Sequence, residues 1–278
     1  SIGDLLKGVI VQSGNDASIA LAEHIAGGEA EFAYMMNEKA RRLGLRDTNF
    51  VNATGLPSDD HYSTANDLAR LTIELIKNHP NHYEIYAERS FEYNGINQTN
   101  RNKLLWRDLS VDGVKTGYTK KAGYCLVASA KRDGMRLVSV VLGTASDQDR
   151  MKESQKLLSF GFRNYETQLL YRANSEITRL KVFYGKSDAV SIIAPTDVYV
   201  TAPRGDLESA VTELSVPKHL EAPINKNDVI GSLAVVLAGE DEVIYETKVL
   251  AADDIREANL FGKVSDFFYL FYSELFGE

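Results

Sequence analysis

The sequence predicts an α+β fold, and three observations support this. Apolar residues recur at helical spacing along the chain as far as Pro80. From Ser90 to Gly143 the pattern changes to short apolar runs that are typical of strands. Helical spacing then returns over residues 147–165, where the apolar positions are Met151, Leu157, Leu158 and Phe162. Early helices, an antiparallel sheet and a helix that returns onto the sheet form one α+β domain.

Local signals delimit the early helices. Gly27-Gly28 and Gly44 end the second and third helices, and Ser63 or Thr64 caps the start of the fourth. The predicted helices cover residues 2–12, 16–26, 29–43 and about 64–79. Ser13-Gly14-Asn15 therefore lies at a junction between two helices, where a loop can direct polar side chains into a cleft.

The strand region is expected to form an antiparallel hairpin with a third strand beside it. Gly123–Ala130 and Met135–Leu142 flank an Asp-Gly turn, and both are apolar enough to be central strands. Lys115-Thr116-Gly117 is expected on the neighbouring edge strand. There it would present an ammonium, a hydroxyl and a glycine that admits a substrate backbone, and its N–H groups could hold a carbonyl oxygen. A strand with a solvated lysine is the alternative interpretation of these three residues.

The composition changes near Glu166. Short alternating strands such as Val198–Thr201 and Leu233–Leu237 follow, separated by turns that include Gly239-Glu240-Asp241. This pattern predicts a small all-β domain without a catalytic constellation, for which a spacer or binding role is the default. The predicted division of the chain is 1–165 for the α+β domain, 166–256 for the β-rich domain and 257–278 for a closing amphipathic helix.

The closing helix has one aromatic, apolar side. This side comprises Leu260, Phe261, Val264, Phe267, Phe268, Phe271, Leu275 and Phe276, and the polar side carries Lys263, Asp266, Ser273 and Glu274. A helix docked on the β-rich domain is one interpretation. The number of phenylalanines favours a helix that lies in a membrane interface. No apolar run approaches the length that a membrane-spanning helix requires.

The overall composition excludes some classes of function. A net charge of −8 and a pI of about 5.3 argue against nucleic acid as a partner, because no basic stripe is present to neutralise phosphates. His79 and His82 have no third ligand nearby, so neither a metal nor another cofactor is expected. The single cysteine, Cys125, leaves the redox compartment undecided, and its place in an apolar strand disfavours a cysteine hydrolase.

The order Ser13-x-Asn15 followed by Lys115-Thr116-Gly117 resembles that of the penicillin-recognising serine acyltransferases. The residues around these motifs resemble more closely the low-molecular-mass D-alanyl-D-alanine carboxypeptidases, of which type-5 and type-6 penicillin-binding proteins are the nearest. The stretches that carry this resemblance are Val11–Ala17, Asn52–Pro57, Tyr62–Ala65 and Asn100–Trp106. The similarity extends over essentially the whole chain. Nothing resembles the deacylating Glu loop of class A β-lactamases.

The resemblance implies a β-lactamase/transpeptidase-like catalytic domain that a β-rich domain holds off the membrane. It further implies a serine peptidase that removes the terminal D-Ala from peptidoglycan pentapeptides and is acylated by β-lactam antibiotics. The expected location is the periplasmic face of the bacterial inner membrane, with peripheral attachment through the C-terminal helix. A non-catalytic protein that binds peptidoglycan stems or a partner on the same fold is the alternative.

The resemblance also implies a role for each motif residue. Ser13 would relay a proton toward the leaving group, and the Asn15 amide would hold a substrate amide. Lys115 would keep the electrostatic field positive near Ser13. The backbone N–H of Tyr118, which follows Gly117, would complete the oxyanion hole.

Binding of the terminal carboxylate falls, by the same resemblance, to two further residues. Thr116 lies next to the strand lysine, and Arg150 lies in the first turn of the helix over residues 147–165. Together they would explain cleavage from the C-terminus.

The nucleophile of the resembled family is the serine of a Ser-x-x-Lys that starts a helix upstream of Ser-x-Asn. Only twelve residues precede Ser13, so the sequence is expected to lack that segment and to be inactive alone. The one Ser-x-x-Lys present is Ser215-Val216-Pro217-Lys218. Its proline stands where a helix interior would be, and it falls in the β-rich region, so it is interpreted as a decoy.

Overall fold

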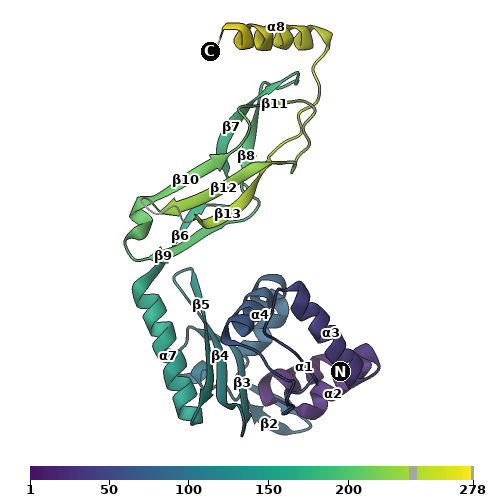
Figure 1. Ribbon diagram of the computed structural model, residues 1–278, viewed down its shortest axis with the longest axis vertical. Helices are drawn as coiled ribbons and strands as arrows, with labels where there is room; N and C mark the ends of the chain where they lie inside the picture. Colours follow the sequence, from purple (N-terminus) through teal and green to yellow (C-terminus); the bar gives the residue numbers. More distant parts are fainter. Residues whose placement is uncertain (238–242, 277–278) are drawn as a thin grey trace. The chain divides into compact units, whose positions relative to one another are not determined.

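The computed structural model describes residues 1–237 and 243–276 (Figure 1). The chain forms two compact units, Ser1–Arg163 and Asn164–Glu278. The first combines helices with an antiparallel sheet, and the second is built of strands and ends in a helix, so the predicted fold class is confirmed. The predicted turn at Gly239-Glu240-Asp241 lies outside the described residues.

Helices form the first part of unit 1. They are α1 (Ile2–Lys7), α2 (Asn15–Ala26), α3 (Glu29–Arg42), α4 (Ala65–Asn78), α5 (Pro80–Tyr83) and, after a hairpin, α6 (Leu104–Arg107). The prediction of a single helix over residues 2–12 is wrong in one respect. The chain leaves α1 after Lys7 and continues as a π-helical turn, Gly8–Gln12, which ends at Ser13 in a left-handed conformation. Ser13 therefore follows the π-helical turn and stands two residues before the start of α2.

Two antiparallel sheets complete unit 1 together with α7 (Asp147–Asn164). A small hairpin consists of β1 (Ser90–Tyr93) and β2 (Ile96–Thr99), and the main sheet has the order β3 (Val111–Thr119), β4 (Gly123–Arg132), β5 (Met135–Thr144). Asp133 and Gly134 both have positive φ in the predicted hairpin turn between β4 and β5. Lys115 lies on β3, which is an edge strand as expected.

The sequence predicts β5 as a central strand, but in the described sheet it lies at the other edge. Most of its apolar residues are covered from the faces of the sheet, where α4 contacts β5, and Met135 and Leu137 join the core cluster that α7 and β4 form. The hydrophobicity of a strand shows that its faces are covered, but it does not distinguish an edge strand from a central one. On α7, Met151, Leu158 and Phe162 enter the core as predicted, whereas Leu157 is exposed.

In the part of unit 2 that the structure describes, two sheets surround one hydrophobic core. The two-stranded sheet pairs β6 (Tyr165–Tyr171) with β9 (Val198–Pro203). The six-stranded sheet has the order β10 (Ala210–Ser215), β12 (Val229–Leu237), β13 (Val243–Ala251), β8 (Ala189–Ile193), β7 (Glu176–Phe183), β11 (His219–Glu221). Alternate residues of β9 are buried against β8, β12 and β13. The alternation predicted for residues 198–201 therefore reflects one face on the core and one in solvent.

Unit 2 ends in α8 (Leu260–Phe276). The carboxylate of Asp266 accepts a hydrogen bond from the backbone N–H of Tyr184 at 2.6 Å. On the apolar side, Phe267, Phe268 and Phe271 are 56%, 64% and 54% exposed. The side chains of Phe261, Ser273, Glu274, Leu275 and Phe276 lie outside the described ones. Across the described residues, no helix is both long and apolar enough to cross a bilayer.

Candidate active site

A cleft of about 620 Å³ brings together all seven residues that the sequence nominates for the site. They are Ser13, Asn15, Lys115, Thr116, Gly117, Tyr118 and Arg150. One wall is strand β3, the opposite wall is the turn between the π-helical segment and α2, and residues 53–56 of a long loop close a third side. Residues from the two ends of unit 1 thus meet in one cleft.

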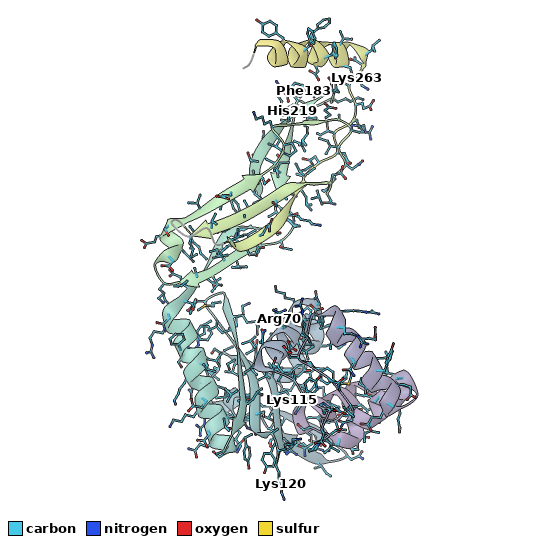
Figure 2. All side chains as sticks on the ribbon, in the orientation of Figure 1. Arg70, Lys115, Lys120, Phe183, His219 and Lys263 are labelled. Carbon is cyan, nitrogen blue, oxygen red and sulfur yellow. The ribbon has the colours of Figure 1, made fainter. Side chains whose placement is uncertain are left out.

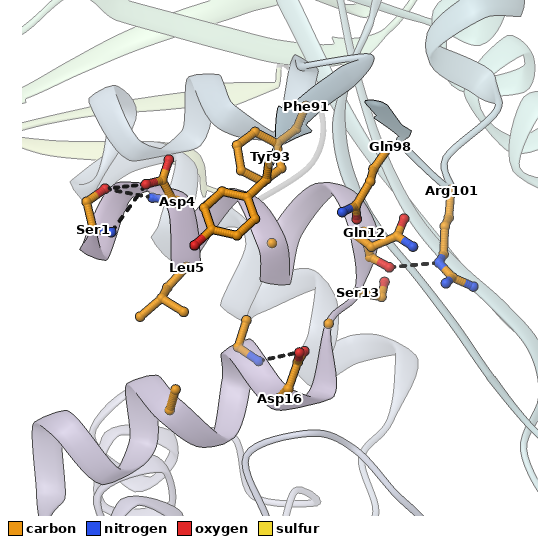
Figure 3. Close-up of a pocket in the computed structure, with 14 residues that line it drawn as sticks. Ser1, Asp4, Leu5, Gln12, Ser13, Asp16, Phe91, Tyr93, Gln98 and Arg101 are labelled. Carbon is orange, nitrogen blue, oxygen red and sulfur yellow. Dashed lines mark hydrogen bonds and ion pairs between the residues drawn. The ribbon is translucent and has the colours of Figure 1, made fainter. Parts of the chain in front are cut away.

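The turn that carries Ser13 is held by the backbone and by one long-range contact. Both the Ser13 and Gly14 N–H groups donate to the carbonyl of Gly8. Arg101 donates from Nε to the Gln12 carbonyl at 2.9 Å (Figure 3). Ser13 is therefore fixed in its left-handed conformation, and Asn15 begins α2 directly behind it.

Lys115 lies on β3 (Figure 2), and its side chain reaches this turn. Its Nζ donates to Ser13 Oγ and, at 3.0 Å, to the Thr116 carbonyl. Burial lowers the pKa of Lys115 to about 8, and the positive charges of Arg101 and Arg150 add to the shift. The ammonium is thus a partly buried cation in a cleft that already holds two other cations.

Gly117 and Tyr118 complete the strand side of the cleft. Gly117 pairs with Cys125 and Tyr118 with Tyr124 on β4. Tyr118 is exposed, and its ring centroid lies 4.3 Å from that of Tyr124. The register leaves the outer edge of β3 unpaired within the described sheet, as the approach of an extended peptide would require.

Arg150 is buried, unlike an ordinary charge at the start of a helix. Its Nη1 donates to the carbonyls of Gly117 at 3.0 Å and Cys125 at 3.2 Å, and its Nη2 contacts Asp147. The guanidinium carbon lies 5.5 Å from the ring centroid of Tyr124. Arg150 thus cross-links β3 and β4 at the level of the Lys-Thr-Gly motif.

Sequence reasoning missed Arg101, which lines the cleft. A signal was available, because Arg101 stands between two asparagines in the stretch Asn100–Trp106 that carries the resemblance. Asn100 and Asn102 are buried, and Asn102 donates to the Gly113 carbonyl at 2.9 Å. Together they fix the start of β3 and the backbone that carries Arg101.

A second hollow, also of about 620 Å³, lies between α1, α2 and the β1–β2 hairpin (Figure 3). It shares Ser13 and Arg101 with the cleft, and Phe91 and Tyr93 line its hairpin side. It therefore borders the same turn from the other side. No group of three or more potential metal ligands occurs among residues 1–237 and 243–276.

The Ser215-x-x-Lys218 motif lies on the end of β10 and the segment after it, in unit 2. Ser215 is exposed and pairs in the sheet with Ser232, so no helix presents the serine to the lysine. We expect a fluorescent penicillin not to label residues 1–278 covalently. In the full-length protein, we expect Ser215→Ala to leave the covalent labelling unchanged. Denaturing gels measure this. Stoichiometric labelling of the 278-residue chain that maps to Ser215 would contradict the decoy interpretation.

Known proteins match this chain over most of its length. Residues 1–146 match the family described as D-alanyl-D-alanine carboxypeptidase, and residues 165–257 match the C-terminal domain of penicillin-binding protein 5. The D-alanyl-D-alanine carboxypeptidase DacA of Haemophilus influenzae is 42% identical over 279 residues, which span 99% of this chain and 70% of that protein. DacC of Escherichia coli is 41% identical over 280 residues, 100% of this chain and 70% of that protein.

Solved structures give the same result. Penicillin-binding protein 5 from Haemophilus influenzae superposes with a TM-score of 0.79 at 42% identity, covering 92% of this chain and 75% of that one. Penicillin-binding protein D2 from Listeria monocytogenes in its ampicillin-bound form has a TM-score of 0.55 at 36% identity, covering 58% of this chain and 68% of that one. The family matches and the solved structures place the fold in the class of penicillin-binding serine hydrolases. The chain belongs to the D-alanyl-D-alanine carboxypeptidase family, and the family predicted from the sequence is confirmed.

Proposed function

We propose that this protein releases the terminal D-alanine of peptidoglycan stem pentapeptides through a serine acyl-enzyme, and that β-lactams acylate the same serine. The observation that carries the proposal is the contact between Lys115 Nζ and Ser13 Oγ, which joins the two motifs in one cleft. The attacking serine and its lysine base would come from a Ser-x-x-Lys segment outside residues 1–278. A non-catalytic role on the same fold is not favoured, since relatives that match the whole chain are named carboxypeptidases.

Each cleft residue has a step to which its position suits it. Ser13 Oγ relays a proton toward the leaving D-alanine amine, while the Asn15 amide holds an amide of the peptide. Lys115 keeps the potential around Ser13 positive as negative charge develops on the scissile carbonyl. The N–H of Tyr118 donates to that oxyanion. The peptide itself lies extended along the free edge of β3.

The terminal carboxylate is assigned to Thr116 and Arg150. The Thr116 hydroxyl offers a hydrogen bond, and the guanidinium supplies a charge behind Gly117. A cation buried in this way attracts an anion more strongly than a solvated one does. Peptides that end in a free acid are therefore preferred over peptides that end in an amide.

Arg150→Ala is expected to reduce the preference for a free-acid peptide over its C-terminal amide, because the proposed partner of Arg150 is the terminal carboxylate. The measurement is kcat/KM for both peptides in the full-length protein. Loss of the Gly117 and Cys125 contacts could lower activity toward both peptides, so the ratio decides. Arg163→Ala is a matched control on the same helix. An unchanged ratio in Arg150→Ala would show that the assignment is wrong.

For the rest of the chain we propose that residues 1–165 work as the catalytic domain, 166–256 as a spacer and 257–278 as an anchor at the membrane surface. The exposed rings of Phe267, Phe268 and Phe271 on one side of α8 support attachment in a bilayer interface. The peptidoglycan substrate supports the periplasmic face of the inner membrane as the location.

A further inference from the structure

The guanidinium of Arg150 belongs to a three-residue ion network behind the cleft. Its Nη2 donates to Asp147 Oδ1, and Lys103 Nζ donates to the other oxygen, Oδ2, at 2.6 Å. The three side chains become progressively more exposed, at 8% for Arg150, 31% for Asp147 and 62% for Lys103. One carboxylate thus bridges a buried cation of the cleft and a solvated cation at the surface.

The donors of Arg150 are largely committed. A guanidinium has five N–H groups, and the Gly117 and Cys125 carbonyls take those of Nη1. Nε is buried without a hydrogen-bond partner. Asp147 is therefore the anion in direct contact with Arg150, so an incoming carboxylate meets a guanidinium whose charge is partly compensated.

Asp147 and Lys103 have opposite effects on the electrostatic potential at Arg150. Burial raises the pKa of Asp147, but the hydrogen bonds and charges of Lys103 and Arg150 outweigh it, and the pKa lies below its usual value. Asp147 is thus ionised at neutral pH and reduces the positive potential at Arg150. Lys103 offsets part of that negative charge from the far side. Removing Asp147 should therefore raise the positive potential at Arg150, and removing Lys103 should lower it.

Asp147 is not needed as the cap of α7, although it stands in the first turn of that helix. Ser146 and Asp149 form the local cap, since Ser146 Oγ donates to Asp149 Oδ2 at 2.7 Å and accepts from the Asp149 N–H at 3.1 Å. The side-chain contacts of Asp147 go to Arg150 and Lys103. Its position serves the guanidinium.

We propose that Asp147 and Lys103 are positioning residues that set how strongly Arg150 attracts the C-terminal carboxylate of the substrate. Asp147 weakens that attraction, and Lys103 restores part of it by sharing the carboxylate. The inference rests on the proposed function, because it assigns a specificity role within the same site. Both residues act through Arg150 and touch no reacting atom.

The test compares Asp147→Asn and Lys103→Met in the full-length protein, with a D-alanyl-D-alanine peptide as free acid and as C-terminal amide. Asp147→Asn keeps a hydrogen-bond acceptor beside Arg150 but removes the charge, and should lower KM for the free acid about threefold to tenfold. Lys103→Met should raise that KM by a smaller factor of about two to five. In both variants kcat for the free acid and kcat/KM for the amide should stay within about twofold, because uniform binding of the carboxylate changes KM alone.

Asp149→Asn is the matched control, since it removes the same charge from the same helical turn without touching Arg150. Thermal unfolding checks that the variants remain folded. Lys103 is largely exposed, so its variant tests the proposal even if Asp147→Asn loses stability. Shifts of the same sign in both variants, or equal shifts for acid and amide, would overturn the inference. Absence of turnover in the unsubstituted protein would remove the proposed function and this inference with it.

Discussion

Replacing Lys115 with alanine is expected to slow acylation by β-lactams and by D-alanyl-D-alanine peptides about a hundredfold or more, as loss of a preorganised charge at a developing oxyanion usually does. Lys115 Nζ contacts Ser13 Oγ and is largely buried. Water that takes the place of the ammonium in Lys115→Ala would therefore stabilise the developing negative charge less well. The measurement is the rate of covalent labelling by a fluorescent penicillin in the full-length protein, together with kcat/KM for a peptide.

The exposed Lys120, one residue beyond the end of β3, is the matched control (Figure 2). Lys120→Ala should label at the rate of the unsubstituted protein. Labelling of Lys115→Ala at that same rate, in a protein that unfolds at the normal temperature, would show that the ammonium does not contribute.

The pH dependence of the unsubstituted protein adds to this prediction. Because burial and the neighbouring arginines lower the pKa of Lys115 to about 8, its charge is present below that pH and is lost as the pH rises through it. Acylation that depends on the ammonium should therefore decline above about pH 8. In Lys115→Arg the charge persists, so a decline caused by this group should disappear.

Removing residues 259–278 is expected to release the protein from lipid vesicles while the β-rich domain stays folded. Burying one phenylalanine side chain in the bilayer interface stabilises the bound state by roughly 1.5–3 kcal/mol. Several exposed rings on α8 together therefore provide more binding free energy than an incidental contact would. The charged residues of this segment are Lys263, Asp266, Glu274 and Glu278, so anionic headgroups contribute little. Raising the salt concentration should thus hardly change binding by the intact chain.

Vesicle sedimentation at low and high salt measures this second effect. Phe267→Ser with Phe271→Ser should weaken binding, whereas Lys263→Ser is the matched control on the other side of the helix. Circular dichroism of the truncated protein checks the β-rich domain, since truncation also removes the hydrogen bond between Asp266 and Tyr184. Release by salt alone would contradict the hydrophobic account, and unfolding on truncation would favour a docked helix instead.

Local chemistry made much of the fold predictable. Gly27 and Gly44 have positive φ at the ends of helices, and Asp133 and Gly134 have positive φ in the hairpin turn. Because these residue types favour such conformations, the local sequence alone predicts the helix ends and the turn. The alternation of β9 likewise reports a half-buried strand. Hydrophobicity did not predict the position of β5 in the sheet. Most of its apolar residues are covered by α4 and α7, and this coverage is the same for an edge strand and a central strand.

The candidate site was predictable as a set of motif residues, and their chemical roles remain predictions. The sequence by itself determined the family, the fold class, the junction at Ser13 between two helical segments and the strand that carries Lys115. Only the tertiary structure decided that Lys115 reaches Ser13 across 102 residues, that Arg101 holds the Gln12 carbonyl, and that Asp147 and Lys103 stand behind Arg150. Periodicity and capping act within a few residues, whereas contacts between distant segments depend on how helices and sheet pack, which no local pattern encodes.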